Sequence, residues 1–145
     1  MAEAAIAGAV LVAVDFSACS LRALDTALRW REASADVTVL HVIDSHLARR
    51  MEQTGLLTYE DIIGQMRATA ERDLATLTAE RGSESFETMI VEGVPFLEII
   101  KIANDLDSDL IVIGSRGHTG VTELFFGGTA EKVVRGGHRP VLCIP

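Results

Sequence analysis

The alternation of short apolar runs with segments of helical periodicity is the feature that most constrains the fold of this chain. Residues 9–14 (AVLVAV) and 37–43 (VTVLHVI) are almost wholly apolar and rich in β-branched residues, as in strands buried on both faces. Further strands are predicted at 86–91, 109–113 and 140–145, and the first of these alternates more, as expected nearer a sheet edge. Strands separated by helices pair in parallel. The sequence therefore predicts an α/β, three-layer fold, with helices on both faces of a parallel sheet.

Four helices are predicted between the strands from caps, apolar spacing and terminal glycines. Ser17 can cap the first helix, and Thr58 with Asp61 fits a capping-box variant at the start of the second. Pro95 suits the first turn of the third helix. The predicted helices lie at 18–30, 58–81, 95–103 and 128–135. Residues 44–57 show no clear period and are predicted to form a long loop or a frayed helix.

Length and composition exclude several classes of protein. The chain has 145 residues, so we expect a single domain over 1–145. Its net charge of −8 disfavours binding to nucleic acid or to anionic membranes. No apolar run reaches the ~18 residues of a membrane span, and the apolar N-terminal stretch lacks the basic region of a signal peptide. Cys19 and Cys143 form no CxxC pair, so we expect reduced thiols and a cytoplasmic location.

A glycine-rich segment follows the fourth predicted strand and leads into the last helix. It reads GSRGHTG at 114–120 and GGT at 127–129. Parallel sheets bind ligands at the carboxyl ends of their strands, and a helix N-terminus offers free N–H groups to an anion. Glycine also lets the backbone approach a phosphate closely. Residues 114–139 carry a net charge of +2 while the rest of the chain carries −10, which favours a small anion as the ligand.

The common nucleotide-binding and catalytic fingerprints are absent from the sequence. There is no GxxxxGK[ST] motif, and residues 15–17 follow the first strand without the glycines of a dinucleotide-binding turn. Ser115 follows a strand but lies in no GxSxG elbow, and no general base accompanies it. Asp44, His46 and His118 match no zinc spacing. We therefore predict neither a catalytic residue nor a metal site.

Several polar residues have both a structural and a functional interpretation. Asp15 either contacts a ligand at the sheet edge or partners the N-terminus of the first helix. His41 is interpreted as a core histidine whose ring is satisfied by the protein. Arg116 and His118 either reach a phosphate or lie solvated at the surface.

Three glycines carry a recognisable pattern, since Gly114, Gly117 and Gly127 are spaced as Gly-x2-Gly-x9-Gly. Three further segments are distinctive: 12–17 (VAVDFS), 40–44 (LHVID) and 129–133 (TAEKV). In these features the chain resembles the universal stress protein (UspA-like) family, whose nucleotide-binding branch has this glycine pattern followed by Ser or Thr. The resemblance covers nearly the whole chain.

The resemblance implies a Rossmann-like fold, with a five-stranded parallel sheet in the order 3-2-1-4-5 and about four helices. It implies a stress-response module that binds ATP, ADP or AMP, commonly with Mg²⁺, and a homodimer formed through the C-terminal strand at 140–145. Asp15 is then expected beside the ribose and adenine, and Val42 at the adenine pocket. The implied nucleotide-binding residues are Ala13, Val14, Asp15, Val42, Ile113, Gly114, Arg116, Gly117, His118, Gly127, Gly128 and Thr129.

Gly128 departs from the family pattern, because the family has Ser or Thr at this position. The missing hydroxyl removes one hydrogen bond, at a cost of ~0.5–1.5 kcal/mol, so we expect altered phosphate contacts that favour AMP or ADP. Thr129 points elsewhere, since a helix turns by ~100° per residue. Two alternatives remain open: a nucleotide-free homodimeric interaction protein, and a slow ATPase or self-phosphorylating protein. In the leading hypothesis the nucleotide biases a dimer, or the segment 44–60 as a lid, and so modulates an unidentified protein partner.

Overall fold

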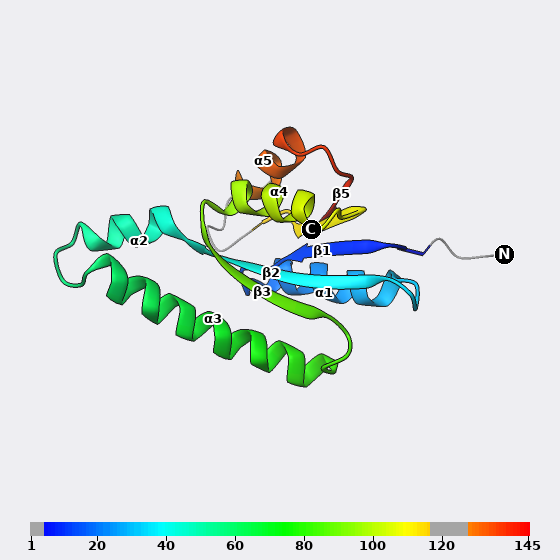
Figure 1. The fold of residues 1–145 in the computed structure, drawn as a ribbon, viewed down its shortest axis with the longest axis horizontal. Helices are drawn as coiled ribbons and strands as arrows, with labels where there is room; N and C mark the ends of the chain where they lie inside the picture. The colour runs from blue at the N-terminus through cyan, green and yellow to red at the C-terminus, as the bar shows by residue number, and fades with distance from the viewer. Residues whose placement is uncertain (1–4, 117–127) are drawn as a thin grey trace.

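The computed structural model describes residues 5–116 and 128–145, which form five strands and five helices around one sheet (Figure 1). The strands are β1 (Ala9–Ala13), β2 (Asp36–Asp44), β3 (Glu87–Gly93), β4 (Leu110–Gly114) and β5 (Val141–Ile144). The helices are α1 (Ala18–Trp30), α2 (Ser45–Glu52), α3 (Tyr59–Arg81), α4 (Pro95–Asp105) and α5 (Gly128–Gly136). Neighbouring strands run parallel in the order β3-β2-β1-β4-β5. The predicted fold class, the strand order and the edge position of β3 are confirmed.

The predicted helix starts are confirmed by their caps. The Ser17 hydroxyl accepts a hydrogen bond from the Ser20 N–H at 3.2 Å and begins α1. Thr58 accepts one from the Asp61 N–H at 3.2 Å and begins α3. Pro95 is the first residue of α4, where its missing N–H costs nothing.

The helix α2 is the one element that the sequence did not predict clearly, and it makes five described helices where about four were expected. The Asp44 carboxylate caps α2 by accepting from the backbone N–H groups of His46 and Leu47, at 3.0 and 3.1 Å. Only Ala48 is fully buried, while Leu47 and Met51 stay exposed. At eight residues α2 is too short for its apolar residues to repeat over several turns, which is why its period escapes sequence analysis.

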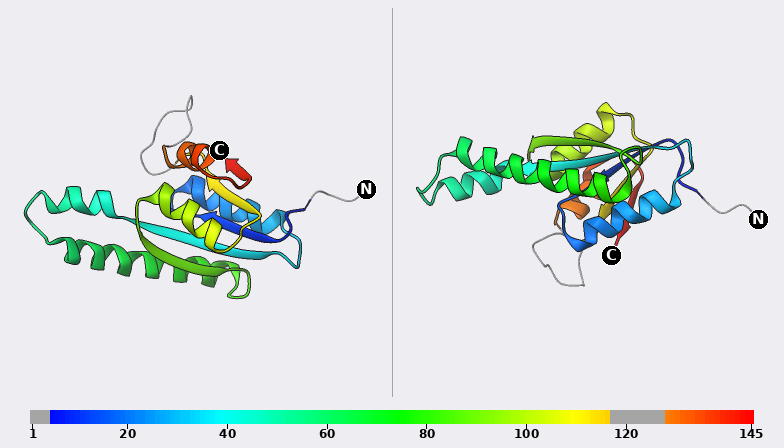
Figure 2. Two further views of the ribbon diagram at one scale, coloured as in Figure 1. Left: turned by 45° about the horizontal axis from the view of Figure 1, so that its top comes forward. Right: turned by 90° about the horizontal axis from the view of Figure 1, so that it is seen from below.

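Helices cover both faces of the sheet, with α1 and α3 on one side and α4 and α5 on the other (Figure 2). Successive residues of β1 face opposite layers. Val12 packs in one cluster with Leu24 of α1 and Leu74 of α3, whereas Leu11 packs with Ile99 of α4. This double burial explains the unbroken apolar run in the sequence. Among the described helices, none combines the length and the hydropathy that a membrane crossing requires.

Candidate functional site

The carboxyl edge of the sheet at β1 and β4 is the switch point of the topology. After β1 the chain places β2 and β3 on one side of it, then crosses to the other side of β1 and places β4 and β5 there. Three of the predicted site residues, Ala13, Val42 and Ile113, lie on the sheet face that α4 and α5 cover. Ala13 is in register with both Leu40 and Ile113, and Val42 lies two residues beyond Leu40 along β2. The strands therefore bring these side chains to one apolar surface at the edge where such folds bind ligands.

A fixed turn carries the chain from β1 into α1 at this edge. The Val14 N–H donates to the Leu40 carbonyl at 2.9 Å, and the Val14 carbonyl lies 2.8 Å from the Nδ1 atom of His41. Phe16 has a φ of 64°, and its ring centroid lies 4.9 Å from that of His41. A positive φ at an aromatic residue is uncommon, so the surroundings must hold it in place. His41 thus has the satisfied structural role that the sequence predicts.

Asp15 belongs to a hydrogen-bonded network at the N-terminus of α1. Its Oδ1 atom accepts from the backbone N–H of Ser17 at 3.0 Å and from the Ser17 hydroxyl at 2.5 Å. The Asp15 N–H donates to the Ser20 hydroxyl at 3.3 Å. The interpretation of Asp15 as a partner of the helix terminus is confirmed, and its contact with a ligand stays a prediction. The network holds the carboxylate at the switch point, where both roles are compatible.

Gly114 ends β4 against the first turn of α1, and this contact explains why the residue is a glycine. A Cβ atom at Gly114 would lie 2.8 Å from the Cys19 Sγ and 3.0 Å from both the Cys19 carbonyl carbon and the Ser20 nitrogen. Such distances are too short for carbon, and two of the three atoms belong to backbone. The sequence suggested close approach of a phosphate at this position. Within the protein, the close approach that requires glycine is the packing of α1 on β4.

The helix α5 presents its N-terminus at the same edge. Ala130 and Val133 are fully buried and anchor the first turns of α5 on the sheet, while Gly128 is exposed. A Cβ atom at Gly128 would meet no heavy atom within 4 Å, so a larger residue has room there. Thr129 is half-buried. The remaining predicted site residues, Gly117, His118 and Gly127, lie outside the described residues.

The four cations counted in the glycine-rich region do not all reach this edge. Arg139 donates to the carbonyl of Ser108 at 2.6 Å and pairs with Asp107 at 3.0 Å, at the opposite, amino end of β4. Arg135 pairs with Glu131 on α5 at 3.0 Å. Arg116 follows β4 at the carboxyl edge, and the Lys132 Nζ lies over the ring of Phe96 at 5.1 Å. The local positive charge is therefore smaller than the sequence count suggests.

Tyr59 joins the α2–α3 hairpin to the carboxyl end of β3, a contact that sequence analysis missed. Its hydroxyl donates to the Glu92 carboxylate at 2.8 Å, and its backbone N–H donates to Glu52 at 2.8 Å. The Arg49 guanidinium lies over the tyrosine ring, 3.7 Å from its centroid. The hydrogen bond to Glu92 raises the pKa of Tyr59. The segment considered as a lid is thus a capped helix that is tied to the sheet, and no signal in the sequence pairs residues 59 and 92.

The described residues contain no cluster of three or more His, Cys, Asp and Glu side chains placed to hold a metal ion. Asp44, one of the residues considered for such a site, instead caps α2, and His46 is exposed. His118 lies outside the described residues.

The fold and the site together define an α/β domain with one parallel sheet, in which Gly114 ends β4 at the switch point of the topology. A model of the universal stress protein family matches residues 8–145, and the chain therefore belongs to this family. The universal stress protein YxiE of Bacillus subtilis is 31% identical over 144 residues, which cover 93% of this chain and 97% of that protein. The universal stress protein MJ0577 of Methanocaldococcus jannaschii is 28% identical over 150 residues, covering 93% of each chain.

The solved structures agree with this assignment. The structure of MJ0577 superposes with a TM-score of 0.81 over 94% of each chain, at 28% identity. A universal stress protein crystallised in complex with cAMP superposes with a TM-score of 0.59 at 21% identity, covering 95% of this chain and 96% of that one. At that identity the second likeness concerns the fold alone.

Proposed function

We propose that this chain is a regulatory module that binds an adenine nucleotide at the carboxyl edge of β1 and β4. The observation that carries the proposal is the convergence of Ala13, Val42 and Ile113 on one apolar surface, onto which Ala130 packs the first turn of α5. A flat base fits against such a surface, and a helix N-terminus attracts phosphate. Membership of a family with a cAMP-bound member supports the same ligand class.

Each part of the nucleotide has a candidate partner. Ala13 and Val14 flank the base, Val14 through its backbone because its side chain packs in the cluster with Leu24 on the other face of the sheet. Val42 lines the adenine pocket, and Asp15 lies beside the ribose. The phosphates fall to the glycine segment and α5, which comprise Gly114, Arg116, Gly117, His118, Gly127, Gly128 and Thr129. The donor set fits Mg²⁺ held mainly by phosphate and water, since this ion commonly binds through one or two carboxylates and Asp15 supplies one. Bound there, the ion supplies charge neutralisation of the phosphates.

Isothermal titration tests the proposal with ATP, ADP, AMP and cAMP, each in the presence of Mg²⁺. The useful variant is Gly128→Ser, which restores the family's hydroxyl at a position with open space. Its matched control is Gly64→Ser, because Gly64 is also an exposed helical glycine at which an added Cβ atom would meet no heavy atom within 4 Å. We expect saturable binding to the wild-type chain, and one regained hydrogen bond should tighten ATP about 2- to 12-fold in Gly128→Ser. Gly64→Ser should change nothing.

The outcomes separate the alternatives. No heat with any nucleotide, in the wild type and in Gly128→Ser, overturns the nucleotide proposal and favours an interaction protein that binds none. Equal affinities of Gly128→Ser and wild type for ATP refute the account of the missing hydroxyl. Phosphate release from ATP above that of a Gly117→Ala variant would instead favour a slow ATPase.

The proposal includes a homodimer formed through residues 140–145. β5 is the outer strand next to β4, and its four residues are all half-buried: Val141, Leu142, Cys143 and Ile144. An apolar edge strand supports pairing with a second copy around a two-fold axis. Light scattering should give twice the 15.6 kDa mass of the chain. A monomeric mass at micromolar concentration would contradict the dimer.

A further inference from the structure

β3 forms the opposite edge of the sheet, far from β5. Within the described residues it pairs with β2 alone, over the register Thr38–Glu87 to Asp44–Gly93. One side of its seven-residue backbone therefore offers N–H and C=O groups along an open edge. Proteins recognise extended peptides at such edges by adding them as a further strand.

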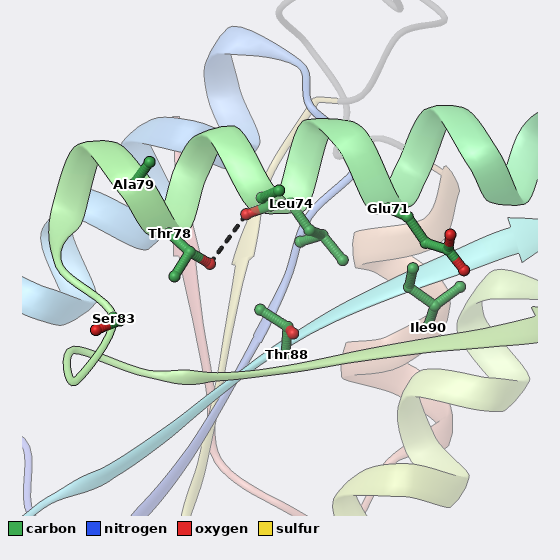
Figure 3. A pocket seen from close by; sticks show the side chains of 8 residues that line it. Glu71, Leu74, Thr78, Ala79, Ser83, Thr88 and Ile90 are labelled. Carbon is green, nitrogen blue, oxygen red and sulfur yellow. Dashed lines mark hydrogen bonds between the residues drawn. The ribbon is translucent and has the colours of Figure 1, made fainter.

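A groove runs along this edge between α3 and β3 (Figure 3). It has a volume of about 590 Å³. Its β3 wall is formed by Thr88 and Ile90, which are two positions apart on the strand and both face α3. The α3 wall and the end of the groove are formed by Glu71, Leu74, Ala75, Thr78, Ala79 and Ser83. Thr78 turns its hydroxyl to the Leu74 carbonyl of its own helix at 2.9 Å, so this wall offers chiefly short and apolar surface. The alanines leave room for the side chains of an added strand.

The charge around the groove has one sign. Glu71 is the single charged residue among those that line it. The chain from residue 82 to residue 93 carries Glu84, Glu87 and Glu92 and no Lys or Arg. On α3, Arg81 is paired with Asp25 at 2.8 Å, while Arg67 and Arg72 are not among the lining residues.

This charge argues against a second copy of the chain as the occupant of the edge. Two β3 strands placed side by side would bring glutamates of both copies together, and like charges on paired strands are destabilising. Charged edges protect sheets from self-association in this way. The same glutamates attract a strand that carries the opposite charge.

We propose that β3 and the groove accept an extended, lysine- or arginine-bearing segment of a partner protein as a sixth strand. Alternate residues of the added strand face α3, where small or β-branched side chains fit between Ile90 and Ala75. The intervening residues of the added strand face the other side of the sheet, where basic side chains lie near Glu87 at the start of β3. This site is distinct from the nucleotide edge and does not depend on it.

Fluorescence anisotropy with a labelled peptide of sequence Lys-Val-Lys-Val-Lys-Val-Lys tests the proposal on the full chain. Two control peptides replace every Lys by Glu, or the central Val by Pro. We expect saturable binding of the lysine peptide and not of either control, and slowed hydrogen exchange of the β3 amides in the complex. Protection of the β5 amides instead, or equal binding of the proline peptide, would overturn strand addition at β3.

A pair of protein variants separates the groove from general electrostatics. Ala75→Arg puts a bulky cation into the groove. Thr69→Arg adds the same charge at an exposed α3 residue outside the lining, turned about 120° away around the helix. We expect Ala75→Arg to weaken the lysine peptide about tenfold or more and Thr69→Arg to leave its affinity nearly unchanged. If both variants are folded by circular dichroism and lose the same affinity for the peptide, the binding is non-specific charge attraction and the proposal is overturned. A wild-type self-association that Ala75→Arg abolishes would assign the groove to a second copy and overturn the proposal.

Discussion

The substitution Gly114→Ala tests whether this glycine exists for packing. The added Cβ would lie 2.8 Å from the Cys19 Sγ and 3.0 Å from two backbone atoms of residues 19 and 20. Carbon contacts at ordinary distances exceed these by several tenths of an ångström, so α1 must shift away from β4. The φ of Gly114 is not among the positive values, so steric overlap rather than backbone strain is the cost.

Overpacking of this kind costs about 1–3 kcal/mol. With a urea slope of about 2 kcal/mol/M, the midpoint should fall by about 0.5–1.5 M with the slope unchanged. Gly128→Ala is the matched control, because nothing lies within 4 Å of its Cβ position and alanine is the better helix former. The control should hold or raise the midpoint.

A second substitution locates the overlap. In a Cys19→Ala background the contact with Sγ is gone while the two backbone contacts remain, so Gly114→Ala should cost less but still destabilise the fold. If Gly114→Ala and the wild type have the same urea midpoint, the packing explanation is refuted. Close approach of a ligand would then be the remaining reason for a glycine at position 114.

Three further substitutions or measurements follow from the structure. Tyr59→Phe removes the hydrogen bond to Glu92, so hydrogen exchange of the α2 amides should accelerate. Because the pKa of Tyr59 is raised in the folded chain, the protection of these amides in the wild type should be complete below about pH 10 and lost as the pH rises through that pKa. The variant should show no such loss of protection. Burial raises the pKa of Cys143, so its alkylation by iodoacetamide should need a higher pH than in the urea-unfolded chain, and identical pH profiles would contradict this. Arg139→Ala leaves the Ser108 carbonyl without its guanidinium donor and should lower the free energy of unfolding in urea by about 1–3 kcal/mol. If Arg139→Lys restored the full stability, the positive charge rather than the guanidinium geometry would be responsible.

The sequence predicts the layers well because most of the strands have a strong local signal. A run such as 9–14 is apolar because both faces of β1 are covered, and Ser17, Thr58 and Pro95 mark helix starts by chemistry that acts within four residues. The helix α2 has a capping aspartate, Asp44, but its eight residues are too few to repeat an apolar period, and Ala48 alone of them is fully buried.

The site is predictable to the extent that topology alone positions it. Ala13, Val42 and Ile113 meet because parallel strands end at one edge. The reason for Gly114 is not predictable, because it depends on Cys19, 95 positions earlier in the chain. Proximity in sequence groups Arg139 with the cations of the glycine-rich region. In the structure β5 begins at the opposite end of the sheet, and Arg139, two residues before it, binds the Ser108 carbonyl there.

The central position of β1 has a consequence for the order in which the molecule assembles. Of the five described strands, β1 is made before the others, yet its partner β4 follows about 100 residues later. The Cys19 thiol of α1 finds its acceptor, the Ile144 carbonyl, only 125 residues further along the chain. Such distant pairings fold slowly, since the loop entropy is spent before the contacts form. A nascent chain that ends before β4 therefore carries its most apolar strand with one edge open, and chaperones that bind such edges should dwell on it until β4 has been made.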